Sequence, residues 1–395
     1  MKKVVSLFLS LFFASSLMAQ SIYYQDKTNV DMARHTGRKE VLRREFVLPS
    51  VNGYQVLKAD LHSHTVFSDG SVTPDYRVRE AWVDGLDVLA VTEHVEYRKW
   101  EGQMLNFLKG YMPEVKATNT NVIEKTSTSQ GIIADLNLSN KLAATAAADY
   151  GLTLIPGVEI TRKPEEIGHF NALFVKDANT IYDADPAESM RKARQQGALI
   201  MHNHPGWRRK SLEMTEFEQK VYAEGLIDGV EIMNGGEFYP TVVKRASDHK
   251  LFMAANTDIH STTSMEYSNM GHQRNMTLIL AKDATLPSVR EALEARRTLA
   301  YSFGTVAGEE QLVKDFFLAC VKLELFKTDA NGKRTFRMTN NTSMDFVLRF
   351  GGNPVQLRAF TSRNVSVAKD KELVFTVENM WIPTEQKHPQ FRLKL

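Results

Sequence analysis

Short, nearly continuous apolar runs alternate with helical patterns from Tyr54 to about Thr305. Strands buried on both faces need such runs, and helical segments between them favour crossover connections and a parallel sheet. The number of these units favours a closed or nearly closed α/β barrel over an open sheet. The expected strands are 56–61, 88–91, 152–155, 170–175, 198–201, 230–233, 251–255 and 276–280, and helices are expected at 74–84, 186–196 and 213–224.

Histidines and carboxylates stand next to most of these expected strands. His62 and His64 are two residues apart at the end of the first one, so both imidazoles project from one face and can bind one ion. Ligands at the carboxyl ends of successive parallel strands converge at one mouth of a barrel. The remaining candidates are Asp69, His94, Glu159, His169, His202, His204, Asp258 and His260. Any single histidine here could be structural, but the whole set favours a metal site.

These motifs resemble the polymerase and histidinol phosphatase (PHP) superfamily. The resemblance covers about residues 58–301, and its signatures occur in motif order: D-L-H-S-H-T, S-D-G, T-E-H, P-G-V-E, N-H-P-G and T-D-I-H. It implies a distorted (βα)7 TIM-like barrel with a metal site of two or three divalent ions, which would be zinc, manganese or iron.

The resemblance also implies how the ligands are shared. His62, His64, Glu159 and Asp258 would hold one ion, and Glu159 would bridge to a second ion at His169 and His204. Asp69, His94 and His260 would hold a third. His202 is an additional possible ligand beside His204, and His169 differs from the others because it begins a strand.

A hydroxide bridging two ions would be the nucleophile, because metals lower the pKa of bound water toward about 7. We expect Glu159, Asp258 and Arg208 to act directly in the reaction. Cations follow three of the ligand motifs and favour an anionic substrate, although each could also be an ordinary charged loop. They are Arg98, Lys99, Arg162, Lys163, Arg208, Arg209 and Lys210.

Trp207 could form an aromatic wall beside the last of these cation clusters. Glu231 and Asn234 could line the pocket or serve in the core or a turn.

The leading functional hypothesis is a phosphoesterase that acts on a small phosphorylated substrate. One alternative is a metallohydrolase of a non-phosphate substrate, and another is a non-catalytic exported binding or assembly protein. The formal charge of +2 falls to 2 − 2 = 0 when Lys2 and Lys3 are removed, which argues against a nucleic-acid partner that binds by broad electrostatics.

The first 19 residues have the pattern of a secretory signal peptide: Lys2 and Lys3, an apolar run over residues 4–17, and Ala19 at the expected cut. The run is too short to span a bilayer, so we expect an exported periplasmic or extracellular protein without a membrane span after cleavage. The single cysteine, Cys320, cannot form an internal disulfide.

The rest of the chain divides into an arm, the barrel and a second domain. Residues 20–52 are expected to be an N-terminal arm and residues 53–306 the barrel, with an insertion at 96–140 that could be a substrate lid or a decoration. From Leu318 the apolar pattern changes to period two, so residues 307–395 are expected to form a small C-terminal all-β domain of the β-sandwich kind.

Overall fold

The computed structural model describes residues 42–98, 100, 135–161, 167–267, 269 and 271–393. Residues 43–395 form one compact unit. The expected signal peptide, most of the arm and residues 101–134 of the insertion lie outside the described residues. Within the described part, no helix has both the length and the apolar character that crossing a membrane requires.

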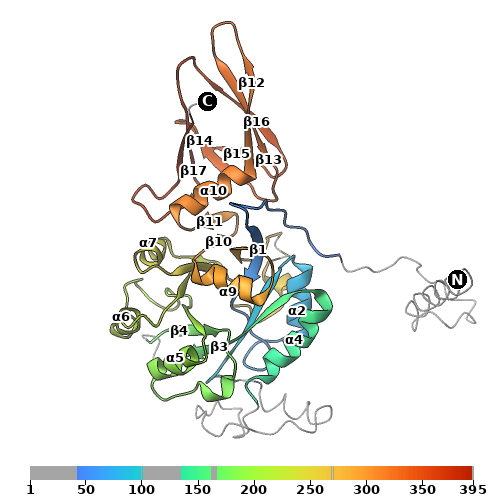
Figure 1. The fold of residues 1–395 in the computed structure, drawn as a ribbon, viewed down its shortest axis with the longest axis vertical. Helices are drawn as coiled ribbons and strands as arrows, with labels where there is room; N and C mark the ends of the chain where they lie inside the picture. Colours follow the sequence, from blue (N-terminus) through green and yellow to red (C-terminus); the bar gives the residue numbers. More distant parts are fainter. Residues whose placement is uncertain are drawn as a thin grey trace, which may run out of the picture. The chain divides into compact units, whose positions relative to one another are not determined.

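The main sheet of the described chain forms a distorted TIM-like barrel (Figure 1). Its order is β18-β11-β10-β9-β1-β2-β3-β4-β5-β6-β7, and β8 also pairs with β6. Its strands are β1 (Gln55–Asp60), β2 (Val88–His94), β3 (Thr153–Thr161), β4 (His169–Leu173), β5 (Leu199–His202), β6 (Gly229–Asn234), β7 (Glu237–Phe238), β8 (Phe252–Asn256), β9 (Met276–Ala281), β10 (Thr298–Ser302), β11 (Thr305–Ala307) and β18 (Met380–Trp381).

The sheet is mixed, which corrects the expectation of a parallel sheet. β4 runs antiparallel to both β3 and β5, and β9 runs antiparallel to β1. Only residues 162–168 connect β3 to β4, which is too short for the crossover that a parallel pair needs. The direction of β4 therefore follows from the length of its connection.

The barrel closes between β8 and the pair β9 and β10 through threonine side chains. The main-chain nitrogen of Met253 donates to Thr298 Oγ1 over 3.1 Å, and that of Ala255 donates to Thr277 Oγ1 over 3.0 Å. Thr277 Oγ1 in turn donates to the carbonyl of Ala255 over 3.1 Å. Side-chain hydroxyls thus satisfy main-chain groups of β8 where it meets this pair of strands.

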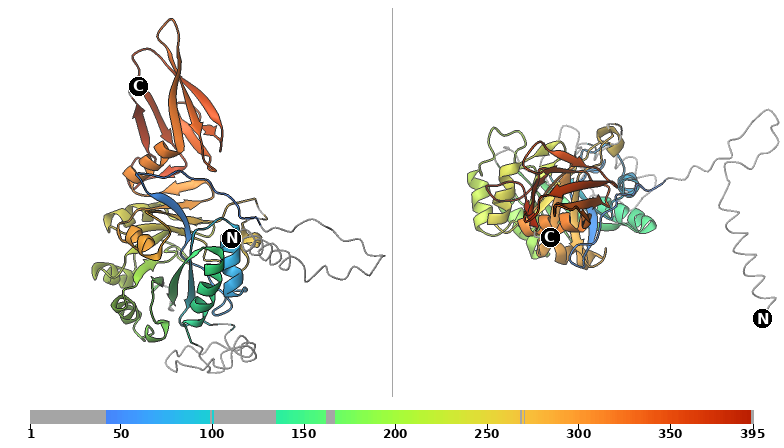
Figure 2. Two further views of the ribbon diagram at one scale, coloured as in Figure 1. Left: turned by 45° about the vertical axis from the view of Figure 1, so that its right-hand side comes forward. Right: turned by 90° about the horizontal axis from the view of Figure 1, so that it is seen from above.

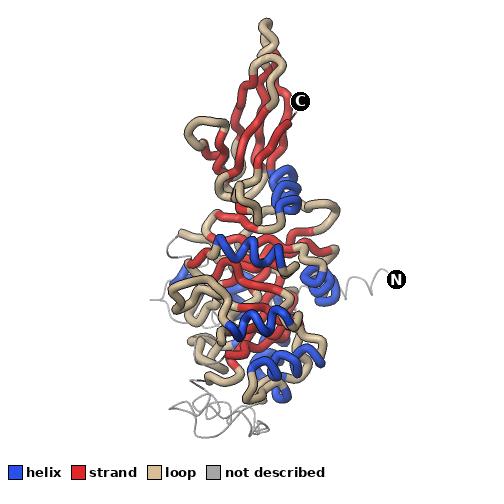
Figure 3. The backbone as a smooth tube through the Cα atoms, turned by 90° about the vertical axis from the view of Figure 1, so that its left-hand side faces the viewer, coloured by secondary structure: helices blue, strands red, loops and turns tan. Residues whose placement is uncertain are grey.

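Helices lie outside the strands of the barrel (Figure 3). The longer helices bury apolar residues on one side; in α7, for example, Val242, Val243 and Ala246 are buried. The helices that the structure describes in the barrel are α2 (Pro74–Val83), α4 (Leu138–Tyr150), η2 (Ala178–Thr180), α5 (Pro186–Gln195), α6 (Glu216–Ala223), α7 (Pro240–Asp248), α8 (Thr263–Glu266) and α9 (Leu286–Glu294).

The C-terminal part contains two small antiparallel sheets, as the period-two pattern predicted (Figure 2). One has the order β12-β13-β16 and the other β15-β14-β17-β19. The helix α10 (Glu310–Cys320) precedes them, so this part is not purely β. The strands are β12 (Val321–Thr328), β13 (Arg334–Asn340), β14 (Phe346–Arg349), β15 (Val355–Leu357), β16 (Ser362–Val367), β17 (Leu373–Val377) and β19 (Gln390–Leu393).

One hydrophobic core joins this part to the barrel. Leu278 and Leu299 of the barrel belong to the same buried cluster as Phe317 of α10 and Phe375 of β17. In addition, β18 pairs in parallel with β11 of the barrel sheet.

Candidate metal centre

The structure brings all nine predicted metal ligands together at one edge of the barrel sheet. Their donor atoms fall into four overlapping groups, each with all donor atoms within 4.8 Å of one another. The groups are His64, Asp69, His94 and His260; His62, His64 and Glu159; His62, His204 and Asp258; and Glu159, His169 and His204.

The direction of β4 explains why His169 joins the others although it begins its strand. His169 is the register partner of Thr161, near the end of β3, so the start of β4 lies at the same sheet edge as the ends of β2 and β3. His94, the last residue of β2, is paired with Glu159 in that register. An antiparallel strand therefore contributes its first residue where parallel strands contribute their last.

Glu159 occupies the middle of the cluster and is fully buried. Its Oε1 lies 3.1 Å from His169 Nδ1 and 3.8 Å from His204 Nε2. Its Oε2 lies 2.8 Å from His94 Nδ1 and 3.4 Å from His64 Nε2. The two oxygens thus face different sets of histidines, as a carboxylate that bridges two ions would.

His62, His64 and Asp258 form a second convergence of donor atoms. The two Nε2 atoms are 3.1 Å apart, and Asp258 Oδ1 lies 3.1 Å from that of His62 and 3.0 Å from that of His64. The backbone of Asp258 has a φ of 53°, in the left-handed region that costs energy for a non-glycine residue. The strained backbone thus occurs at the residue whose carboxylate contacts the rings of His62 and His64.

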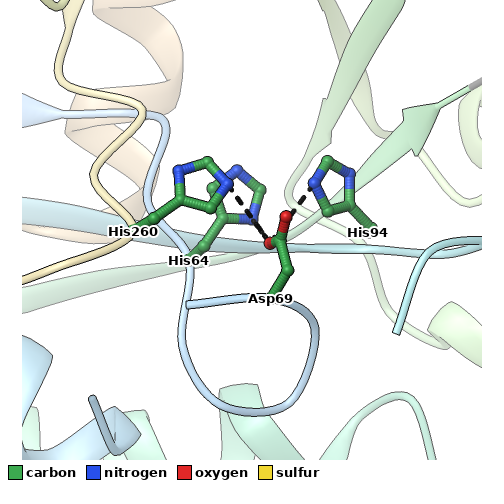
Figure 4. Close-up of side chains that lie close together, drawn as sticks. All are labelled: His64, Asp69, His94 and His260. Atoms are coloured by element: carbon green, nitrogen blue, oxygen red, sulfur yellow. Dashed lines mark ion pairs between the residues drawn. The ribbon is translucent and has the colours of Figure 1, made fainter. Parts of the chain in front are cut away.

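Asp69 is the centre of the third group (Figure 4). Its Oδ1 lies 3.2 Å from His260 Nε2, 3.4 Å from His94 Nε2 and 3.9 Å from His64 Nδ1. The centroid of the His64 ring lies 4.5 Å from that of His94 and 4.4 Å from that of His260, and the ring planes are inclined by 22° and 25°.

The carboxylates shift the pKa values of the surrounding histidines. Burial opposes the protonation of His94, but the negative charges of Glu159 and Asp69 outweigh it and raise the pKa of His94 to about 10. Burial and the neighbouring His260 and His94 lower the pKa of His64 to about 4. Burial disfavours ionised Glu159, but His94 and His62 hold its pKa well below the usual range. Without ions, protonated histidines thus balance the carboxylates.

The donor set fits divalent cations. His62 Nδ1 faces Glu231 Oε1 at 3.0 Å, and a carboxylate can only accept, so Nδ1 carries a proton, and the neutral ring presents its Nε2 lone pair to the cluster. Glu159 Oε2 is buried and forms no hydrogen bond within the described residues. Ligand atoms about 2.1 Å from a shared tetrahedral ion lie roughly 3.4 Å apart, close to the separations here.

Comparison with known proteins places this chain in a family. No family model and no curated protein matches the chain. A solved structure from Bacteroides vulgatus, a two-domain protein containing a predicted PHP-like metal-dependent phosphoesterase, is 32% identical with a TM-score of 0.76. The match covers 90% of this chain and 99% of that chain. The chain belongs to the family of PHP-like metal-dependent phosphoesterases.

A more distant solved structure is a lesion-specific endonuclease from Pyrococcus furiosus. It is 17% identical, with 65% of this chain and 59% of that chain covered and a TM-score of 0.38. A TM-score this low supports no argument about the present PHP-like chain.

His202 is not part of the ligand cluster of this PHP-like chain. Its Nδ1 lies 2.9 Å from the hydroxyl of Tyr222 and its Nε2 lies 3.0 Å from Glu218 Oε1. β5 ends at His202, and His204 has a φ of 24°, so strand alternation does not extend to His204. The structure therefore brings His204 to the cluster and turns His202 toward α6.

Of the predicted cations, Arg208 lies beside the ligand cluster, whereas Arg209 and Arg98 make other contacts. Arg208 is exposed, and its guanidinium lies 4.3 Å from the ring centroid of Trp207, which is itself 5.1 Å from the His169 ring. Arg209 instead lies 2.7 Å from Glu218, and Arg98 donates to the carbonyl of His94 over 3.4 Å. Lys99, Arg162 and Lys163 lie outside the described residues.

Three further buried carboxylates, at Asp60, Glu93 and Glu231, surround the ligands of this PHP-like site, and none was predicted as a ligand. Asp60 accepts from the main-chain nitrogens of His62 and Thr257, at 3.2 Å each. The sequence does carry a signal for them, because a carboxylate inside a buried strand needs donors nearby. Glu93 and Glu231 interrupt the apolar runs of β2 and β6 in this way.

Proposed function

We propose that this protein is a phosphoesterase that hydrolyses a small phosphorylated substrate with two or three divalent ions. The convergence of nine buried or half-buried histidine and carboxylate side chains around Glu159 carries this proposal. Membership of the PHP-like family supports it, because the Bacteroides vulgatus relative contains a predicted metal-dependent phosphoesterase. Mixed nitrogen and oxygen ligands suit zinc, manganese or iron.

The proposed ligands are the nine residues predicted from the sequence. They are His62, His64, Asp69, His94, Glu159, His169, His204, Asp258 and His260. Ions bound there would supply a water of lowered pKa as the nucleophile, bridging two of them as hydroxide, and would offset charge on the phosphate oxygens.

The chain's own groups at the site would position the anion. Trp207 lies beside the rings of His169 and His204, with centroid distances of 5.1 and 5.6 Å, and carries Arg208 on its face. We propose that Arg208 binds a substrate phosphate oxygen from this position. A guanidinium matches the geometry of phosphate oxygens and stays charged at all working pH values.

The proposal is tested by metal analysis followed by a substrate panel. Elemental analysis of protein purified without chelator should find at least two divalent ions per chain. Phosphomonoesters and phosphodiesters should then be hydrolysed, with loss of activity after chelation and recovery when the ions are returned. Bound metal without phosphatase activity would overturn the phosphoesterase assignment, and protein without bound metal would overturn the metal assignment.

We also propose that the protein is exported and cleaved after Ala19, on the evidence of its amino-terminal sequence alone. Mass spectrometry of the protein recovered from periplasm and medium should find chains that begin near Gln20. Retention of residues 1–19 in a membrane fraction would contradict this proposal.

A further inference from the structure

Glu231 contacts two separate ligand segments at once. It lies in β6 and is fully buried. His62 Nδ1 lies 3.0 Å from its Oε1, and the main-chain nitrogen of His204 donates to its Oε2 over 2.7 Å. Asn256 and Asn234 donate from their side-chain amides, over 2.9 Å to Oε1 and 2.8 Å to Oε2.

All four of these groups are N–H donors, and a carboxylate can only accept. Glu231 therefore keeps a proton of His62 on Nδ1, so that the neutral, metal-binding ring presents its Nε2 lone pair toward Asp258, His64 and Glu159. It also holds the backbone of His204, whose positive φ needs support from its surroundings.

We propose that Glu231 is a positioning residue that orients His62 and His204 for metal binding. The inference rests on the proposed function only in so far as the cluster binds metal; it does not depend on which substrate is hydrolysed. Three of the four ligand groups contain His62 or His204, and the group of His64, Asp69, His94 and His260 contains neither. Loss of Glu231 should therefore affect the metal centre unevenly.

Glutamine at position 231 would keep the size of the side chain but not its chemistry. Its amide nitrogen would replace one of the two acceptor oxygens and would face two N–H donors. One ligand segment, at His62 or at His204, would lose its partner, and a buried donor left without a partner is costly.

Glu93 offers a matched control, because it is an equally buried carboxylate next to a ligand but has different partners. Its Oε1 accepts from the hydroxyls of Thr65 and Ser139, the latter over 2.8 Å. Its Oε2 accepts from the hydroxyl of Ser68 and from the main-chain nitrogen of Thr65, the latter over 3.2 Å. Hydroxyls can donate or accept, so glutamine can place its amide toward two of them and its oxygen toward the Thr65 nitrogen.

The test measures metal binding rather than activity. Metal-stripped wild-type, Glu231→Gln and Glu93→Gln proteins are titrated with Zn²⁺ or Mn²⁺ against a competing chelator, and their ion content is measured by elemental analysis. Circular dichroism and thermal melting of the stripped proteins show that each is folded. We expect Glu231→Gln to retain one ion and to bind the others about 10–100-fold more weakly. Glu93→Gln should match the wild type.

A double variant assigns the ion that remains. Adding His260→Ala to Glu231→Gln should remove that ion, because His260 belongs to the group that Glu231 does not contact. Wild-type stoichiometry and affinity in Glu231→Gln would overturn the proposal, and so would equal weakening of every ion or equal losses in Glu93→Gln.

If Glu231→Gln does not fold, Glu231→Asp carries the test, because it keeps both acceptors at a shorter reach. Weaker binding of the same ions would support the proposal, and unchanged binding would overturn it. Failure of the proposed function is separately visible, because the metal measurements stand even if no phosphate ester is hydrolysed.

Discussion

At the scale of single residues, Glu159 decides how the metal centre holds together. Its two oxygens face different histidines, with His169 on one side and His94 on the other. The Glu159→Gln variant keeps the shape but removes the charge that would hold two ions, so metal content and turnover should fall together. Elemental analysis and steady-state kinetics on the same preparations check this, and a variant that keeps every ion and its full rate would contradict the central role of Glu159.

Arg208 provides the contrasting case, because it lies on Trp207 and in none of the ligand groups. Its replacement by alanine should leave the metal content unchanged. It should lower kcat/KM by an amount that corresponds to about 1–3 kcal/mol of lost transition-state stabilisation, the size of a charge-assisted contact. Elemental analysis and steady-state kinetics of the variant check this prediction. Loss of ions from Arg208→Ala would show that this arginine stabilises the site itself.

Protonation of the histidines should make metal binding depend on pH. Burial opposes a charge on His94, but Glu159 and Asp69 raise its pKa to about 10, so the metal-free protein carries this proton at pH 7. A divalent ion must displace it, so binding should release protons, and affinity should fall as the pH is lowered. Calorimetric titration in buffers of different ionisation enthalpy measures the release. Binding without proton release at pH 7 would contradict the prediction.

The ten candidate ligands could be predicted from the sequence because each belongs to a short motif next to an apolar run, and the resemblance to the PHP superfamily implied the set of nine without His202. The surrounding carboxylates could not, since their role depends on donors far away in the chain. Glu231, for example, is 169 residues from His62. A carboxylate within a buried strand needs hydrogen-bond donors, but the sequence does not say which residues supply them.

At the scale of elements, strand existence was easier to predict than strand direction. Apolar runs marked β1, β2, β4, β5, β6, β8 and β9 closely, whereas β3 continues to Thr161, beyond its expected end at residue 155, and the short β7 was not expected. Such runs are equally apolar in parallel and antiparallel neighbours. The short connection before β4 determines its direction. Similarly, alternation placed His202 and His204 on one face, and the end of β5 at His202 separates them.

The two histidines of this segment should therefore respond differently to mutation. His202→Ala removes the partner of Glu218 and Tyr222 and should lower the free energy of unfolding by about 1–3 kcal/mol with full metal content. His204→Ala should lose metal. Denaturant unfolding and elemental analysis of both variants test the contrast, which fails if His202→Ala loses ions while remaining folded.

At the scale of the whole molecule, the change of the apolar pattern to period two from Leu318 indicated a second, β-rich part after the barrel. The pattern could not show how the two parts meet, because the contact is made by α10 and by residues distant in sequence. Phe317 of α10 contacts the rings of Phe346, Phe375 and Phe391, with centroid distances of 5.2, 5.7 and 4.7 Å. The same buried cluster continues to Leu278 and Leu299 in the barrel.

A continuous core predicts that the barrel and the C-terminal part unfold together. Phe317 is 1% exposed, so Phe317→Ala should lower the free energy of unfolding by about 3–5 kcal/mol. Phe326→Ala is the control, because this phenylalanine is in the same C-terminal part but 48% exposed, and its loss should cost less than about 1 kcal/mol. Hydrogen exchange measured at increasing denaturant concentrations should show that peptides of β2 and of β17 lose protection at the same concentration. In Phe317→Ala, that denaturant concentration should be lower for both strands. If β17 opens first while β2 stays protected, the shared core does not couple the barrel to the C-terminal sheets.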